Sequence, residues 1–197
     1  MQNEISALIK GAQQGNKHAF SKLVEEHYKQ VYNMCYRMLG NRDDAEDAAQ
    51  ETFLRAYKAI KRYDRNRKFM TWLLSIAANY CIDQQRKRRL PTFSIDDAPY
   101  IQLRDSQPSV EKIYVTGEEN QKVHQMLNIL KPKDRAAVIF FYWHDYSYEE
   151  IAAAISLTTS AVKSRMHRAK LEMAKAWMEK RSQPILLERT QHETPAI

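Results

Sequence analysis

Residues 146–170 contain basic and polar side chains at spacings that suit contact with DNA. In the second half of this segment Val162, Met166 and Ala169 recur at helical intervals, so the side of the helix that carries them should pack inward. The outward side carries groups that can bond phosphates or base edges: Ser160, Lys163, Ser164, Arg165, His167 and Arg168. We interpret this segment as a helix for the major groove. An ordinary helical hairpin with a solvated basic face is the alternative.

A shorter helix is expected to hold the basic one in place. Ser147 and Glu150 have the spacing of a capping box, which predicts that a helix begins there. Ile151, Ala154 and Ile155 give this helix an apolar stripe, and a turn follows over residues 156–159. Two helices joined by a tight turn predict a helix-turn-helix, which places its second helix in the major groove.

A second polar surface runs through residues 61–89, which are strongly basic. A loop over residues 61–68 leads into a helix whose polar side chains recur at steps of about four. Basic groups around polar and aromatic ones can hold single-stranded nucleic acid, and Asn can pair with adenine. The candidate residues are Arg62, Tyr63, Arg65, Arg67, Lys68, Ser75, Asn79, Asp83 and Arg86. Tyr63 is the stacking candidate, whereas Phe69 and Trp72 are expected in the core. A loop that is basic only for solubility is the alternative.

An acidic surface directly precedes this basic one. Glu46, Asp47, Gln50 and Glu51 lie three and four residues apart, so a helix would present them together. A solvated helix face is the alternative reading. An acidic helix followed at once by a basic one nevertheless suggests two surfaces for two different partners.

The hydrophobic pattern predicts an all-α chain with two small helical domains. Only four glycines occur among 197 residues, and no alternating strand pattern is found. Four helices are expected within residues 1–89, near 3–14, 17–39, 43–60 and 69–88. Four more are expected near 117–130, 133–144, 147–155 and 160–180, and the second domain spans residues 118–180. Residues 90–117, with Pro91, Pro99 and Pro108, predict a flexible linker, and residues 181–197 a tail.

The composition points to a binding protein with a polyanionic partner. The formal net charge is +7 and the pI is about 9.3. No apolar run approaches the roughly 18 residues of a membrane span, so no membrane insertion is expected. Cys35 and Cys81 fall in apolar helical patterns and are expected to be buried, reduced thiols. His18, His27 and Cys35 match no standard metal site. No catalytic constellation appears, so we expect no enzyme, metal or cofactor.

Four motifs in chain order resemble those of extracytoplasmic-function (ECF, group 4) sigma factors of the sigma-70 family, which direct bacterial RNA polymerase. Residues 8–20 resemble the opening helix of the family. The segment DAEDAAQETF at 44–53 is very similar to region 2.2, and FMTWLLSIAAN at 69–79 to regions 2.3 and 2.4. Residues 146–170 resemble the region 4.2 helix-turn-helix. The resemblance runs from about Leu8 to Trp177, nearly the whole chain.

The resemblance implies a role for each surface. Glu46, Asp47, Gln50 and Glu51 would bind the polymerase core, which contributes its β′ and β subunits. Residues 61–86 would capture the opened minus-10 strand, with Asn79 at a base-reading position, and the basic helix would contact the minus-35 duplex. The chain would be an alternative sigma factor that initiates transcription from specific promoters, including those of stress responses. It would be cytoplasmic, and an anti-sigma factor, often anchored in the membrane, would inhibit it.

The chain departs from the family pattern at four positions. The family's Gly and Thr at the recognition helix are Ser160 and Ala161, Lys131 stands where Pro is usual, and Asp145 replaces a common Gly. These changes affect base preference and turn geometry. Two other functions remain open from the residues alone: a helix-turn-helix repressor acting without polymerase, and a helical adaptor that binds RNA or an acidic protein.

Overall fold

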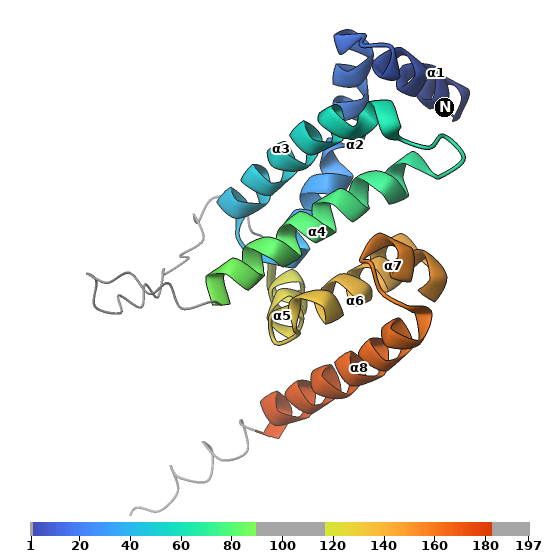
Figure 1. Ribbon diagram of the computed structural model, residues 1–197. Coiled ribbons are helices and arrows are strands. Elements are labelled where there is room, and N and C mark those ends of the chain that lie inside the picture. The colour runs from blue at the N-terminus through green and yellow to red at the C-terminus, as the bar shows by residue number, and fades with distance from the viewer. Residues whose placement is uncertain (1, 90–116, 183–197) are drawn as a thin grey trace, which may run out of the picture.

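The computed structural model describes residues 2–89 and 117–182 (Figure 1). In these residues all regular structure is helical, which confirms the all-α prediction. The first group of helices is α1 (Gln2–Gln13), α2 (Lys17–Leu39), α3 (Arg42–Ala59), a short 3₁₀ turn (Ile60–Arg62) and α4 (Phe69–Arg89). The second group is α5 (Gly117–Asn128), α6 (Pro132–His144), α7 (Tyr148–Ala154) and α8 (Thr159–Ser182). The expected linker, apart from Gly117, and most of the expected tail lie outside the described residues.

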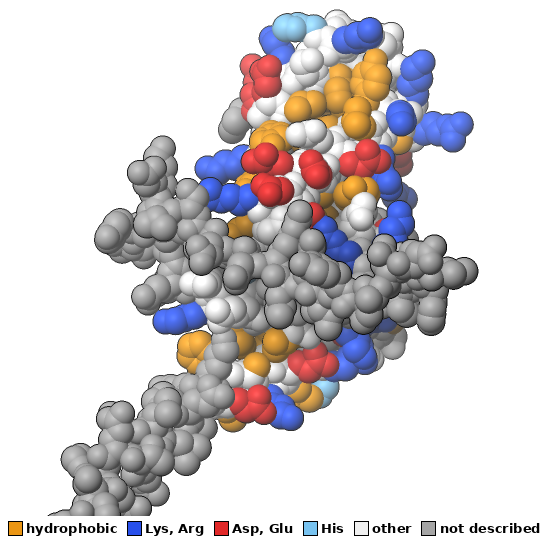
Figure 2. Space-filling view, turned by 90° about the vertical axis from the view of Figure 1, so that its left-hand side faces the viewer, with side chains coloured by type: hydrophobic (Ala, Val, Ile, Leu, Met, Phe, Trp, Pro, Cys, Tyr) orange, Lys and Arg blue, Asp and Glu red, His pale blue; other side chains and the backbone are white. Residues whose placement is uncertain are grey.

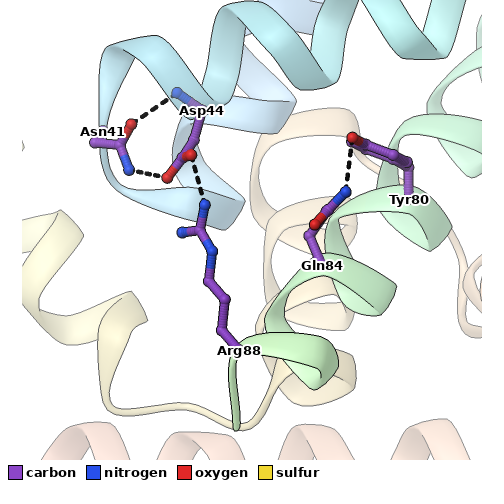
Figure 3. Close-up of polar contacts among 5 residues, drawn as sticks. All are labelled: Asn41, Asp44, Tyr80, Gln84 and Arg88. Carbon is purple, nitrogen blue, oxygen red and sulfur yellow. Dashed lines mark hydrogen bonds and ion pairs between the residues drawn. The ribbon is translucent and has the colours of Figure 1, made fainter. Parts of the chain in front are cut away.

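Local caps define where the helices of the first group begin and end. The Asn16 side chain accepts a hydrogen bond from the Ala19 N–H at 3.1 Å and so begins α2. Gly40 ends α2 in the left-handed conformation, with φ 85°, and its N–H donates to the Tyr36 carbonyl. Asn41 caps α3 at the N–H of Asp44, whose carboxylate also binds Arg88 at 2.5 Å (Figure 3). This last contact ties the start of α3 to the end of α4.

The predicted capping box at the start of α7 is confirmed. The Ser147 hydroxyl accepts a hydrogen bond from the Glu150 N–H at 3.2 Å, and the Glu150 carboxylate accepts one from the Ser147 N–H at 2.9 Å. Asp145, which precedes this helix, adopts the left-handed conformation with φ 53°. A Gly adopts that conformation without steric cost, and Asp is among the residues that also tolerate it.

Helix α4 is buried on two sides. Phe69 is buried as expected, whereas Trp72, which was also expected in the core, is half-buried. Leu73 is wholly buried, and Ile76 and Tyr80 are half-buried. Leu74 and Ala78, on other sides of the helix, are also wholly buried. The reason is that α2 and α3 pack against α4 from one side while α6 and α7 pack against it from the other (Figure 1). The two groups of helices therefore share one continuous buried cluster.

Candidate nucleic-acid interface

The outward face of α8 is open to solvent. Val162, Met166 and Ala169 are buried against the rest of the helix-turn-helix, as their spacing predicted. The polar positions between them are exposed: Ser160, Lys163, Ser164 and His167. The turn before α8 is closed by Thr158, whose hydroxyl accepts from the Ala161 N–H at 3.2 Å. These four side chains therefore form a polar surface on one face of a helix, free to meet a DNA groove.

Two arginines of α8 turn back toward the protein. Arg165 donates to Asp134 of α6 at 2.6 Å, and Arg168 donates to the other oxygen of the same carboxylate at 3.3 Å. Asp134 is wholly buried, so these cations neutralise a charge that water cannot reach. Sequence analysis missed Asp134, because an acidic residue in the first turn of a helix already suits the helix dipole. Arg165 was predicted to contact DNA, but in this structure its partner is Asp134.

The loop over residues 61–68 exposes its basic side chains but not its tyrosine. Arg62, Arg65, Arg67 and Lys68 are exposed, as expected for a surface that follows a phosphate backbone. Tyr63, the predicted stacking residue, is instead buried, so its ring is not accessible to a base in this structure. Its ring packs 5.5 Å from Phe69 and 4.8 Å from Trp72 between centroids, and its hydroxyl donates to the Arg67 carbonyl. Burial also raises the pKa of Tyr63.

The predicted polar face of α4 is divided into two parts. Asp83 and Arg86 are exposed and lie 3.8 Å apart as an ion pair. Ser75 and Asn79 are half-buried. The Asn79 amide donates to the Ser75 carbonyl at 2.8 Å and to the Ala154 carbonyl of α7 at 3.0 Å. The candidate base-reading residue is therefore engaged by the second group of helices in this structure.

The acidic face of α3 remains accessible. Glu46, Asp47 and Gln50 are exposed, and the partly exposed Glu51 pairs with Arg55 at 2.7 Å. Figure 2 shows acidic side chains gathered in a band on the side of the molecule where α3 lies, with hydrophobic side chains above them. On α3 itself Leu54 and Tyr57 are exposed by 56% and 41%. An acidic surface that borders exposed apolar side chains has the composition of a protein-binding site.

The two cysteines and His27 lie inside the protein and have partners there. Cys35 and Cys81 are both buried free thiols, and a hydrogen bond with Cys35, together with burial, raises the pKa of Cys81. His27 is buried, and its Nδ1 lies 2.9 Å from the Leu23 carbonyl. Within residues 2–89 and 117–182, no three His, Cys, Asp or Glu side chains are grouped as a metal site. In the same residues, no helix has an apolar stretch long enough to span a bilayer.

Comparison with known proteins identifies relatives of both groups of helices. Residues 23–90 match the sigma-70 region 2 family and residues 120–173 match the sigma-70 region 4 family. The chain is 34% identical to the ECF RNA polymerase sigma factor SigW of Bacillus subtilis (strain 168), over 89% of this chain and 97% of that protein.

Solved structures show the same fold. The complex of CnrH with the cytosolic domain of CnrY matches with a TM-score of 0.65 and 23% identity, over 89% of this chain and 98% of that one. The sigma factor RpoE from Bartonella quintana, solved in complex with the anti-sigma factor NepR, matches with a TM-score of 0.57 and 22% identity. That match covers 79% of this chain and 94% of that one.

Proposed function

Because the chain belongs to the ECF sigma factors of the sigma-70 family, we propose that it binds the RNA polymerase core and directs it to alternative promoters. Its own contribution is binding energy rather than catalysis. It brings the polymerase to a duplex element, minus-35, and holds one strand of an opened element, minus-10. Each of these three contacts would use a separate surface of the described residues.

The acidic face of α3 is the proposed docking surface for the core. Glu46, Asp47, Gln50 and Glu51 supply the charge, and Leu54 supplies apolar area beside them. Charges at the edge of an interface steer association, whereas desolvated apolar groups supply most of the affinity. The proposed partner surface is a basic, partly apolar part of the β′ subunit.

The outward face of α8 is the proposed contact with the minus-35 duplex. Lys163, Ser164 and His167 are exposed on one face, with Ser160 at the start of the helix. Lys163 can neutralise a phosphate or reach a guanine edge. Arg168 keeps 46% of its side chain exposed and can contact a phosphate while it still pairs with Asp134. Arg165 acts mainly by holding α8 on α6, so its effect on DNA is indirect.

The basic loop and α4 form the proposed contact with the minus-10 strand. Arg62, Arg65, Arg67 and Lys68 would follow the phosphates, and Arg86 would extend that surface at the other end of α4. Asn79 and Ser75 lie between them and would contact bases. Because Tyr63 is buried, it supports the loop and is not part of the proposed stacking surface.

An anti-sigma factor is the proposed inhibitor. The sigma factor RpoE of Bartonella quintana was solved in complex with the anti-sigma factor NepR, and CnrH was solved in complex with the cytosolic domain of CnrY. A partner of this kind would act in the cytoplasm, where the polymerase is. A membrane-anchored partner would hold the chain at the membrane without any membrane-spanning segment in the described residues.

The observation that carries this proposal is the combination of an exposed acidic face on α3 with an exposed basic face on α8 in one chain of this family. The test is transcription reconstituted from purified chain, core polymerase and a library of genomic DNA fragments. We expect specific transcripts only when chain and core are both present. A specific footprint on duplex DNA by the chain alone, without stimulated initiation, would instead support a repressor.

A further inference from the structure

The apolar inner side of α8 is buried along most of the helix but exposed near its end. Val162, Met166 and Ala169 are at most 1% exposed. Met173 continues the same side and is partly buried, and Trp177, one helical turn further on, is 48% exposed. In the described residues, the far end of this apolar stripe therefore faces solvent.

That exposed end forms one wall of an apolar groove. The groove has a volume of about 370 Å³ and lies between α5, α6 and α8 (Figure 1). Its lining includes two side chains from each of these helices, namely Val123, Met126, Tyr142, Trp143, Met173 and Trp177. A contiguous, hollowed apolar surface of this size suits the binding of another apolar segment.

The sequence supplies an apolar segment directly after α8. The helix ends at Ser182, and residues 184–187 read Pro-Ile-Leu-Leu. Residues 183–197 lie outside the described residues. Pro184 cannot continue a helix, so a change of chain direction is favoured there. Three consecutive aliphatic side chains are unfavourable in water, so Ile185, Leu186 and Leu187 favour an apolar surface.

The length of chain between α8 and these aliphatic residues matches the position of the groove. Trp177 and Met173 lie five and nine residues before Ser182, which is about 7.5 Å and 13.5 Å along the helix axis. Residues 185–187 lie three to five residues beyond Ser182 and reach about 10–16 Å in an extended chain. A tail that reverses direction at Pro184 therefore brings its aliphatic side chains alongside the exposed end of the stripe.

We propose that the tail folds back along α8 and that Ile185, Leu186 and Leu187 occupy the groove. The tail is then an intramolecular ligand of the second group of helices. A connection this short gives it an effective concentration on the order of millimolar. Any protein that binds the same groove must displace the tail first, so its apparent affinity falls with the fraction of chains whose groove is open. The inference concerns the free chain and does not depend on the proposed function.

The three tryptophans of the chain allow a direct test. Trp143 and Trp177 line the groove, whereas Trp72 of α4 does not. The full chain is labelled with fluorotryptophan, and each fluorine NMR resonance is assigned by replacing one Trp with Phe. The polar-tail variant carries Ile185→Ser, Leu186→Ser and Leu187→Ser. The matched control changes three polar residues of the same tail: Thr190→Ser, Gln191→Ser and Thr194→Ser.

We expect the polar-tail variant to shift the Trp143 and Trp177 resonances and to leave that of Trp72 in place. The difference in shift between water and heavy water should increase for Trp143 and Trp177, because their rings become more exposed. A synthetic peptide of residues 183–190, added at about the millimolar concentration that the tether provides, should reverse these changes. The control variant should match the unmodified chain. Unchanged groove resonances in the polar-tail variant, or equal changes in both variants, would overturn the inference.

A second measurement uses the otherwise unmodified chain and identifies the occupant. The photoreactive amino acid p-benzoylphenylalanine replaces Leu186, and the products of irradiation are mapped by mass spectrometry. We expect cross-links within one chain to Val123, Tyr142 or Trp177. Cross-links between two chains would show that a second copy occupies the groove, and would overturn the inference. Cross-links confined to other surfaces, or none at all, would overturn it as well.

Discussion

Arg165 of α8 lies against Asp134 of α6, with 2.6 Å between Nη1 and Oδ1, although the two residues are 31 positions apart in the sequence. The carboxylate is wholly buried, whereas the Arg165 side chain is 27% exposed. This difference in exposure makes the pair asymmetric. Removing the cation leaves a buried charge, but removing the carboxylate leaves cations that water can still reach.

The first prediction follows from that asymmetry. Arg165→Met should lower the free energy of unfolding by about 3 kcal/mol, because Arg168 alone must then neutralise the buried carboxylate. Asp134→Asn should cost only about 1 kcal/mol, since the amide still accepts a hydrogen bond. Urea denaturation of the purified variants measures both. Lys163→Met, on the exposed face of the same helix, is the matched control and should change stability by less than about 0.5 kcal/mol.

The same three variants separate folding from DNA contact. Lys163→Met should weaken binding of the holoenzyme to its minus-35 duplex and reduce the salt dependence of that binding, because one phosphate or base contact is lost. Equal losses of stability in Arg165→Met and Lys163→Met would show that the contact with Asp134 is not structural.

The second prediction concerns core binding through α3. Asp47→Lys combined with Glu51→Lys should raise the dissociation constant for core polymerase by about tenfold, equivalent to about 1.4 kcal/mol. Stability should change little, since the Glu51–Arg55 pair lies at the surface and contributes about 0.5 kcal/mol or less. Fluorescence anisotropy of a labelled chain titrated with core measures the affinity.

The matched control carries the same change of charge on another helix. Glu25 and Glu26 of α2 are exposed and lie outside the proposed docking surface. The chain with Glu25→Lys and Glu26→Lys should bind core almost as tightly as the unmodified chain. If both double variants lose affinity equally, the effect is one of net charge and α3 has no special role.

The third prediction is a pH dependence of stability centred on His144. Burial, with a smaller contribution from Arg37, lowers the pKa of His144 from 6.5 to about 4. In the unfolded chain the pKa returns to about 6.5. Between these two pH values His144 is protonated in the unfolded state but neutral in the folded state. The contribution of His144 to the free energy of unfolding is therefore fully present above about pH 6.5 and is lost progressively as the pH falls toward 4. Burial lowers the pKa of His27 and His124 as well, which acts in the same direction.

Replacement of one histidine tests this dependence. His144→Phe removes a titratable ring that lies among Phe140, Tyr146 and Arg37, and the new ring can pack against Phe140. Urea midpoints measured from pH 8 to pH 4.5 should fall less steeply for this variant than for the unmodified chain. Gln30→Phe, at an exposed position without a titratable side chain, is the control and should leave the slope unchanged. Parallel slopes for all three chains would contradict the assignment to His144.

The fourth prediction concerns the left-handed residue between α6 and α7. Asp145 has φ 53° and ψ 36°, and its N–H donates to the Phe140 carbonyl. Asp145→Val should lower the free energy of unfolding by about 1–2 kcal/mol, because a β-branched side chain is strained in this conformation. Asp145→Gly relieves backbone strain in the folded state but increases the conformational entropy of the unfolded chain. The free energy of unfolding should therefore change by no more than about 0.5 kcal/mol. Thermal unfolding of the three chains compares them, and equal stability of the Val and Gly variants would rule out this explanation.

Sequence alone determined the positions of the helices, the cap at the start of α7 and the exposed polar faces of α3 and α8. The capping box of Ser147 and Glu150 and the buried stripe of Val162, Met166 and Ala169 were both predicted and are both present. Each of these depends on residues only a few positions apart, and local spacing along a helix is what a sequence displays directly.

Only the tertiary structure decided which polar side chains already have hydrogen-bond or ion-pair partners within the protein. The bond from Asn79 to Ala154 joins positions 75 residues apart, and the pair of Arg165 and Asp134 joins positions 31 apart. Tyr63 lies in a loop, as expected, yet it is buried because Phe69 and Trp72 close around its ring. A polar residue looks the same in the sequence whether its hydrogen-bond partner is solvent, DNA or a carbonyl far away in the chain. Which partner it meets depends on how whole helices pack, and that packing is a sum over contacts that no short stretch of sequence contains.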